Sequence, residues 1–476
     1  MQILVTLHAA QGRVVTRDEL LERCWGAVFV AEDSLNRAIS EARRALREVG
    51  LTDAAIETIP RTGYRWAIPA EQAEGAKPAP SVANPGRRRL LAGGAAACMA
   101  AGAGLWWQLR ARGKDGHVQA LLAAGERELN LNTASSEQKG IALLEEAVAL
   151  DSNNAEAWGR LTLAIAQSSE HDAPASASPH FARVEEVAGR ALRLNPDNAD
   201  ALAGREIARP YYGDWLAAEQ RLRAVLARHP GHPAAEDSLS FLLAAVGRIQ
   251  EGAAMREGIV RRAPLNAAYQ HRLVYGLWFQ GRIAEADRVA ARGLETWPRH
   301  PGLWFGHLWV LANTGRLDRA IARVANAETR PPMPQPIVDT LRMGLLAAQS
   351  RRATDIEQAS ASILKQVEAS PAAVVSAMMV LNIMGALDTA FDVAHAYYLD
   401  RGPILADLNW RPGTFSLPDQ RRRKSNMLFV PTARVMQNDP RFLPLVRNMG
   451  LVEYWNRRGV TPDFIASARE IPSIAS

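Results

Sequence analysis

Four arginines gather on one short segment near the amino terminus, and their guanidinium groups are the first side chains that suggest a chemistry. The segment 34–48 repeats apolar residues at three- and four-residue spacing, which predicts an amphipathic helix. The faces turned away from the apolar stripe hold these arginines together with Glu41. Such a cluster attracts anions, and the alternative is an ordinary solvated helix face. The polar positions are Asn36, Arg37, Ser40, Glu41, Arg43, Arg44 and Arg47.

A second basic pair, Arg61 and Arg65, falls in a segment that predicts a β-hairpin. Residues 56–66 alternate in the manner of strands, and Thr62 with the glycine after it marks the turn. Upstream, Thr16 and the acidic residues after it predict the capped start of a helix over 17–25. Residues 1–68 contain nine arginines and nine acidic residues, so the basic charge is concentrated on a few elements.

The order helix, helix, basic hairpin is that of a winged helix, and three sequence blocks carry a family resemblance. The blocks GRVVTRDELLERCWG, EDSLNRAISEARRAL and IETIPRTGYRW resemble, in order and spacing, the carboxyl-terminal two thirds of the OmpR/PhoB-type DNA-binding domain. The resemblance implies that the helix 34–48 enters the major groove of double-stranded DNA, while the wing touches the minor groove or phosphates. By position, the residues implied to face bases are Asn36, Arg37, Ser40 and Arg44. Those implied to face phosphates are Arg43, Arg47, Arg61 and Arg65, with Thr62 in the wing.

The sequence departs from this family in two places. The family domain begins with a small antiparallel sheet, whereas this sequence begins within the first family helix. We therefore expect residues 1–68 to form an amino-terminally truncated winged helix. Glu41 stands where several family members carry a positive side chain, which weakens the implied attraction to phosphate.

An uncharged run of twenty residues, 90–109, follows a Pro-, Ala- and Gly-rich flexible linker over 69–89. Its length matches the hydrocarbon thickness of a bilayer, so it predicts a single transmembrane helix, with a buried Ala-rich helix as the alternative. Winged helix, linker, span and repeats together resemble membrane-anchored one-component regulators of the CadC/ToxR kind. This resemblance implies a single-pass protein of the bacterial inner membrane, with a cytoplasmic amino terminus and a periplasmic carboxyl terminus. Gly93, Ala97 and Ala101, each four apart, predict a close-packing face for a homodimer.

Two interleaved series of residues at a period of 34 mark the following region as a repeat array. Prolines recur at 196, 230, 264, 298 and 332, and glycines recur at 213, 247, 281 and 315. A period of 34 is that of the tetratricopeptide repeat, with two antiparallel helices in each unit. We expect about seven to eight units in an α-solenoid over 118–405 and a capping segment over 406–476. The fold class expected for the whole chain is mainly α.

No pattern typical of catalysis is present. The sequence contains no phosphate-cradling glycine loop, no HExxH, no GxSxG and no Cys/His cluster, and its two cysteines are Cys24 and Cys98. His229 and His232 flank one turn and His300 lies near another, which is too little for a metal site. We therefore expect no enzyme activity, no catalytic residue, no cofactor and no bound metal.

These patterns favour a membrane-anchored transcription regulator. In this hypothesis the winged helix binds double-stranded DNA, and the periplasmic repeat domain senses an unknown protein, peptide or small-molecule ligand. Two alternatives stay open: an envelope protein-interaction scaffold with a non-functional winged-helix remnant, and a wholly cytoplasmic regulator whose Ala-rich run is buried. The solenoid groove would bind the ligand, although aromatic residues at helical spacing are more often core than groove lining. The aromatic candidates are Trp278, Trp304, Phe305 and Trp309.

Overall fold

The computed structural model divides the chain into two compact units, Met1–Ala101 and Gly102–Ser476, which are described separately. The described residues of the first unit are 6–7, 10, 13–17, 19–20, 39, 42–43, 56–59 and 62–66. Those of the second unit are 115–168, 177–209, 211–369, 373–399, 401–402 and 425–469. The finer domain boundaries expected from the sequence remain predictions.

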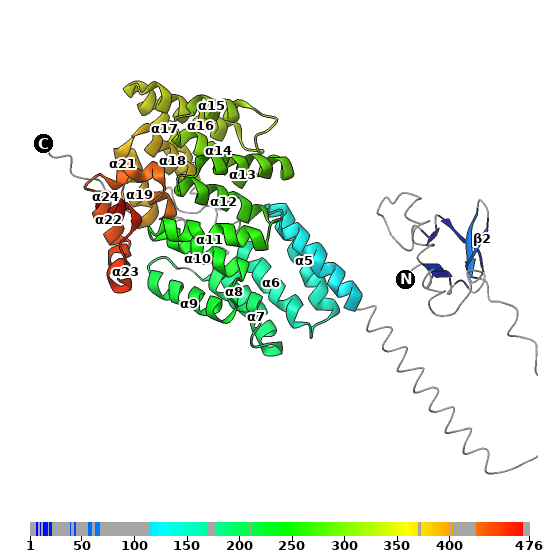
Figure 1. Cartoon of the computed structure of the whole chain (residues 1–476). Helices are drawn as coiled ribbons and strands as arrows, with labels where there is room; N and C mark the ends of the chain where they lie inside the picture. Colours follow the sequence, from blue (N-terminus) through cyan, green and yellow to red (C-terminus); the bar gives the residue numbers. More distant parts are fainter. Residues whose placement is uncertain are drawn as a thin grey trace, which may run out of the picture. The chain divides into compact units, whose positions relative to one another are not determined.

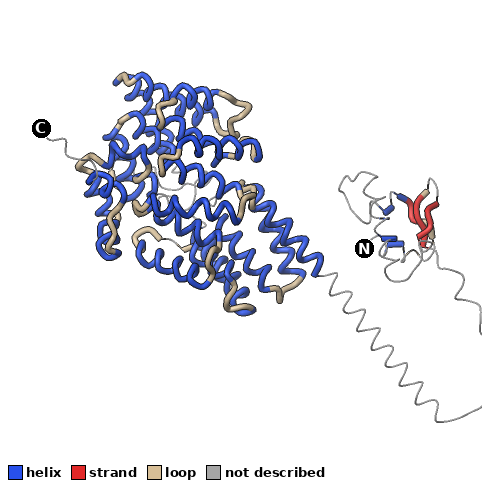
Figure 2. Tube along the Cα trace, in the orientation of Figure 1, coloured by secondary structure: helices blue, strands red, loops and turns tan. Residues whose placement is uncertain are grey.

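A small antiparallel sheet is the main regular element of the first unit (Figure 1, Figure 2). Its strands are β1 (Val15–Thr16), β2 (Ile56–Ile59) and β3 (Gly63–Trp66), in the order β1-β3-β2. Glu57 lies opposite Arg65 in the register of β2 and β3. The hairpin expected over residues 56–66 is therefore confirmed.

The core of this unit joins the sheet to the helical residues. Ile39 and Ala42 are both buried and lie three residues apart, as expected for the apolar stripe of the helix 34–48. The predicted helix cap is also present, because Oγ1 of Thr16 accepts the backbone N–H of Glu19 at 3.2 Å. Among the described residues of this unit, the buried core is formed by Leu7, Val15, Leu20, Ile39, Ala42, Ile56 and Tyr64.

Gly63 is required by a close approach of two strands. A Cβ at this position would lie 2.0 Å from the carbonyl oxygen of Val15 in β1. No side chain fits there, so the glycine that marked the turn in the sequence serves the pairing of β1 with β3.

Eight consecutive helix pairs fill the described part of residues 115–399 (Figure 1). The first helices of the pairs are residues 115–129, α6 (Ala155–Ser168), α8 (Ala199–Ala208), α10 (Pro233–Ala245), α12 (Ala267–Phe279), α14 (Pro301–Asn313), α16 (Gln335–Ser350) and α18 (Val374–Met384). The second helices are α5 (Ala134–Leu150), α7 (Ala177–Leu194), α9 (Trp215–Arg228), α11 (Ile249–Arg262), α13 (Ile283–Thr296), α15 (Leu317–Ala325), α17 (Ala353–Ala369) and α19 (Leu387–Leu399). The mainly α class and the solenoid of helix pairs are thus confirmed.

Left-handed glycines end the first helices of the repeats. Gly247, Gly281 and Gly385 have φ of +81°, +74° and +77°. Residues other than glycine adopt such backbone angles only at a cost in conformational energy. At Gly247 the next N–H, that of Arg248, returns to the carbonyl oxygen of Leu243 at 2.8 Å, which closes a Schellman motif. The glycine series in the sequence therefore marks the turn within each pair.

A second 34-residue series caps the start of the first helices. The side chains of Asn198, His232, Asn266 and His300 each accept the backbone N–H three residues later. These bonds satisfy donors that a helix start otherwise leaves unpaired. His232 and His300, two of the three histidines considered for a metal site, therefore cap helices in this fold.

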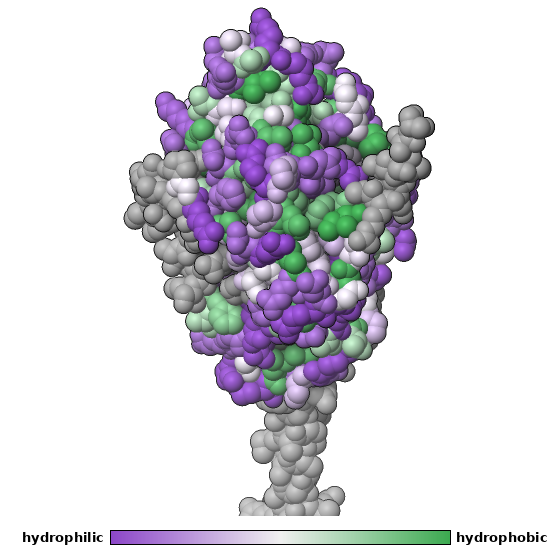
Figure 3. All heavy atoms as spheres, turned by 90° about the vertical axis from the view of Figure 1, so that its left-hand side faces the viewer, coloured by the Kyte–Doolittle hydropathy of each residue, from purple (hydrophilic) through white to green (hydrophobic). Residues whose placement is uncertain are grey.

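The carboxyl-terminal segment folds back onto the middle of the solenoid. Its elements are η6 (Ser425–Leu428), η7 (Pro431–Ala433), α21 (Arg434–Gln437), α22 (Phe442–Asn448), α23 (Leu451–Arg458) and α24 (Asp463–Arg469). They lie beside α19 and also against α9, α10 and α11 (Figure 1). On the face shown in Figure 3, hydrophobic and hydrophilic residues are interspersed.

The expected transmembrane helix requires a correction. Among the helices of the described residues, none combines the length and the apolar character needed to cross a bilayer. The predictions of a single-pass span and of an inner-membrane location are wrong by this finding. The run 90–109 lies outside the described residues, and so do Gly93, Ala97 and Ala101, on which the homodimer was predicted. Its length suited a bilayer, but seven of its twenty residues are alanine and four are glycine, which contribute little apolar surface.

Candidate functional site

Arg43, one of the predicted phosphate contacts, makes two hydrogen bonds within the protein. Its Nη2 donates to the carbonyl oxygen of Ile56 at 3.0 Å and to Oγ1 of Thr58 at 2.7 Å. Arg43 directly follows buried Ala42, so these bonds fasten its helix to β2 beside the core. A phosphate contact would have to use the remaining donors of the guanidinium group.

Arg65 and Thr62 lie on the hairpin that the family resemblance assigned to the wing. Nε of Arg65 donates to Oε2 of Glu57 at 3.0 Å, and Nη2 reaches the same oxygen. Both side chains are more than 40% exposed, so water screens this cross-strand pair, which nevertheless offsets part of the positive charge of Arg65. Thr62 is exposed in the turn, where its N–H donates to the carbonyl oxygen of Ile59 at 3.1 Å.

The structure therefore brings Arg43 and Arg65 to neighbouring positions around β2. The other predicted DNA-binding residues lie outside the described residues, and the DNA contacts of the whole set remain predictions. These other residues are Asn36, Arg37, Ser40, Arg44, Arg47 and Arg61.

The side of the solenoid lined by the first helices is partly filled by the chain itself. The carbonyl oxygen of Asn130, after the first helix, accepts the N–H of Ala267 in α12 at 2.9 Å. From the other end of the unit, Oγ of Ser425 donates to the carbonyl oxygen of Ala245 in α10 at 2.7 Å. An open groove along the whole solenoid, as expected from the sequence, is thus interrupted by two of the protein's own segments.

A buried polar cluster fixes the carboxyl-terminal segment to this side of the unit. Glu219 of α9 is 1% exposed and accepts from the hydroxyl of Tyr454 and from Nη1 of Arg248, each at 2.8 Å. Burial alone would raise the pKa of Glu219, but the bonds from Tyr454, Arg223 and Arg248 outweigh it and lower this pKa to about 2. Glu219 therefore stays ionised in a fully paired site.

Arg248 belongs to a series that the sequence analysis missed. It follows Gly247 directly, and Arg316 follows Gly315 two repeats later. Arg316 pairs with Asp287 at 2.6 Å, which repeats the Arg248–Glu219 pair at a distance of two units. The signal was present in the sequence as arginines after the repeating glycines, so the 34-residue period could have revealed these links between neighbouring second helices.

The aromatic residues considered for the groove are mostly core residues. Trp304, Trp309 and Trp278 are 0%, 2% and 3% exposed, and Phe305 is partly buried against the same core. This agrees with the interpretation that the sequence favoured.

Within the described residues, no cluster of His, Cys, Asp and Glu side chains could hold a metal ion. His232 illustrates the structural use of these groups. Its Nδ1 accepts the N–H of Ala235, and its Nε2 lies 2.9 Å from Oδ1 of Asp200 in the preceding unit.

The described residues thus form a small unit with a three-stranded antiparallel sheet and a solenoid of helix pairs with a 34-residue period. Residues 1–66 match the family model described as transcriptional regulatory protein, C terminal. No curated protein sequence matches the chain significantly.

The chain also matches solved structures, at low sequence identity. A tetratricopeptide repeat protein from Parabacteroides merdae is 16% identical, with a TM-score of 0.31, covering 52% of this chain and 92% of that chain. Yeast Tom70 is 12% identical, with a TM-score of 0.32, covering 69% of this chain and 67% of its own. The tetratricopeptide domain of P58(IPK) is 12% identical, with a TM-score of 0.20, covering 67% of this chain and 98% of its own.

Proposed function

We propose that the chain is a transcription regulator whose winged helix binds double-stranded DNA and whose helix-pair unit binds the molecule that controls this binding. The observation that carries the DNA-binding half is the match of residues 1–66 to the transcriptional regulatory family. The hairpin, the helix cap at Thr16 and the buried stripe at Ile39 and Ala42 support it, because they are the elements that a winged helix needs to hold a reading helix.

The partner half of the proposal follows from the solenoid. Stacked helix pairs form a continuous core and present large surfaces, and such folds act by binding. The side lined by the first helices is partly filled by Asn130 and by the segment from Ser425 onward. This arrangement divides the surface into separate pockets, which suit a small molecule better than a long extended peptide.

A protein-interaction scaffold with a silent winged helix is the second candidate. The observation that favours it is the internal pairing of Arg43 and Arg65, which leaves these side chains fewer donors for phosphate. A scaffold would bind DNA no better than any basic protein does, without preference for a sequence.

Selection from a pool of short duplexes with a randomised core separates the two candidates. The full chain is immobilised, bound duplexes are eluted and amplified over successive rounds, and the enriched sequences are read. The regulator predicts convergence on a common motif whose affinity falls steeply as KCl rises from about 50 to about 200 mM. Failure of the pool to converge would contradict the regulator and favour the scaffold.

A further inference from the structure

A partly open cavity of about 150 Å³ lies in the helix-pair unit, where the carboxyl-terminal segment meets four of the first helices. Residues of α10, α11, α12, α14 and α18 line it together with η6 and Val430. The cavity thus draws on helix pairs far apart in the sequence and is completed only by the returned segment.

One wall of the cavity is a buried guanidinium group with unused donors. Arg256 of α11 is 5% exposed, and its Nε and Nη1 are buried without a hydrogen-bond partner. The nearest carboxylate, Asp237, is 3.8 Å from Nη1, too far for a hydrogen bond, and Asp237 already binds Arg272. Two cations therefore share one buried anion, which leaves a net positive charge at the cavity wall.

Such a group is costly for the folded protein. Burial lowers the pKa of Arg256 to about 10, the attraction of Asp237 opposes this effect, and the repulsion of Arg272 adds to it. The group still carries its charge at neutral pH. Buried polar groups in native proteins are nearly always paired, so an orphaned cation at a cavity wall is accounted for if a ligand anion pairs with it.

Room for this side chain depends on Gly276 of α12. A Cβ at this position would lie 2.8 Å from Cδ of Arg256. The missing side chain gives the stem of Arg256 its path between α11 and α12.

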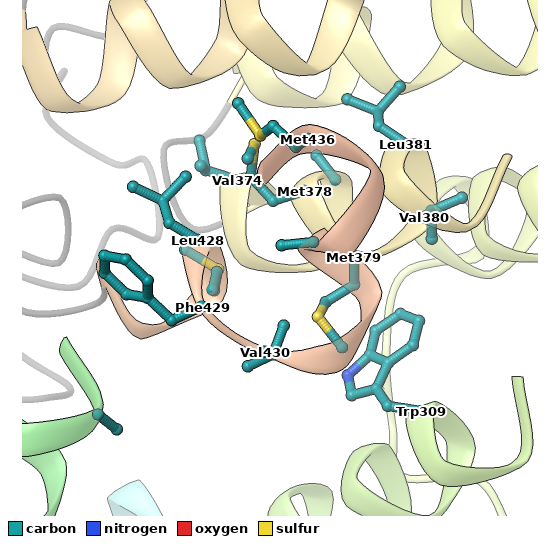
Figure 4. Packing of buried hydrophobic residues seen from close by; sticks show 14 of the residues in the cluster. Trp309, Val374, Met378, Met379, Val380, Leu381, Leu428, Phe429, Val430 and Met436 are labelled. Atoms are coloured by element: carbon teal, nitrogen blue, oxygen red, sulfur yellow. The ribbon is translucent and has the colours of Figure 1, made fainter. Parts of the chain in front are cut away.

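Another part of the lining is apolar and aromatic. Trp309 of α14, Met379 of α18 and Val430 lie together in Figure 4, and each is less than 5% exposed. Tyr275 and Phe279 of α12 complete this wall. A cavity of about 150 Å³ holds a benzene-sized molecule, so the space suits a single ring or a short branched chain.

We propose that this cavity binds a small monocarboxylate with an aromatic or branched apolar body, its carboxylate on Arg256 and its body against Trp309 and Met379. The buried Oδ1 of Asn426 also lacks a hydrogen-bond donor and offers an acceptor to a hydroxyl on such a ligand. The inference rests on the proposed function in one respect: this ligand would be the molecule that controls DNA binding.

Calorimetric titration of the full chain with benzoate tests the site without DNA. Benzoate is expected to bind saturably with one site per chain. Benzamide, which keeps the ring but lacks the charge, and inorganic phosphate, which lacks the apolar body, are each expected to bind at least about tenfold more weakly. Equal binding of benzamide or of phosphate would overturn the assignment, and so would the absence of saturable benzoate binding.

Matched variants locate the site. Arg256→Met removes the charge with little change of volume, and it should weaken benzoate binding by at least about tenfold. Arg288→Met removes the same charge from an exposed position of α13 and should leave the affinity within about twofold. Val375→Phe narrows the cavity without touching the arginine and should also abolish binding. Equal losses for Arg256→Met and Arg288→Met, or full binding by Val375→Phe, would contradict the site. Because DNA is absent, these results stand whether or not the DNA-binding proposal holds.

Discussion

The indole Nε1 of Trp455 donates to the carbonyl oxygen of Val246 at 2.7 Å, across 209 residues of sequence. Val246 ends helix α10, and Trp455 lies on α23 in the returned carboxyl-terminal segment. A second indole makes the reciprocal link, because Nε1 of Trp215 donates to the carbonyl oxygen of Met449 at 3.0 Å. The segment is therefore part of the core of the helix-pair unit.

Replacing Trp455 should destabilise this unit strongly. Trp455→Ala removes a side chain that is 5% exposed and leaves the carbonyl of Val246 without its donor, so we expect a loss of about 3–5 kcal/mol. Urea unfolding followed by circular dichroism measures the change. Leu443→Ala, at a position 43% exposed on α22, is the control and should change the free energy of unfolding by less than about 0.5 kcal/mol. Similar effects of the two substitutions would show that the segment is not docked.

Because Glu219 is ionised and fully paired, the stability of the protein should fall as the solution is acidified. Its pKa lies near 2 in the folded protein, below the ordinary value of 4.5, so the contribution is complete above about pH 4.5 and is lost as the pH falls towards 2. The difference of about 2.5 pKa units corresponds to about 3 kcal/mol. The stability gap between the native chain and Glu219→Gln should therefore shrink on acidification. Glu453→Gln, at an exposed position, should show a gap that is small at every pH.

Replacing glycine by alanine should lower the stability at one position and raise it at another. Gly281→Ala places a side chain at φ +74°, where nothing lies within 4 Å, so its cost of about 1 kcal/mol is purely conformational. Gly306 lies inside α14, and its Cβ would meet Tyr275 and Val274 at ordinary contact distances. Gly306→Ala should therefore stabilise the protein by up to about 1 kcal/mol. Thermal unfolding of both variants checks the signs, and equal signs would contradict the turn assignment.

Removing Arg256, the buried one of the two arginines beside Asp237, should not destabilise the protein. Arg256→Met removes a buried cation without a full partner, so stability in the absence of ligand should be unchanged or should rise by about 1–3 kcal/mol. Asp237→Asn, in contrast, leaves two buried cations without an anion and should cost about 3–5 kcal/mol. Chemical denaturation compares the two variants. A large loss in Arg256→Met would mean that the arginine is structural and needs no ligand.

Local signals in the sequence were sufficient for the repeats and the hairpin. The 34-residue spacing of proline and glycine reports turn geometry that only a few residues tolerate, and Gly247 and Gly281 take the left-handed conformation accordingly. Thr16 and the alternation over residues 56–66 are equally local signals, and both predictions were confirmed.

The return of the carboxyl-terminal segment could not be predicted in the same way. Its contacts, such as Tyr454 with Glu219, join residues more than 200 positions apart and follow no period. The cavity at Arg256 depends on this return, because Asn426, Met427 and Val430 form part of its wall. The transmembrane prediction rested on the length of 90–109, which lies outside the described residues, and no described helix could span a bilayer in its place.

Fluorescence anisotropy on a duplex that carries the selected motif tests the central claim, that the winged helix reads DNA, most directly. The full chain should bind this duplex far more tightly than a shuffled duplex of the same composition. Asn36→Ala, at a position implied to face a base, should weaken binding to the motif by about tenfold. Arg13→Ala removes a charge that pairs with Glu19 at 2.8 Å and is not among the predicted DNA contacts, and it should change the affinity by less than about twofold. Equal affinity for the motif and the shuffled duplex, or an Asn36→Ala variant that binds as the native chain does, would contradict the account.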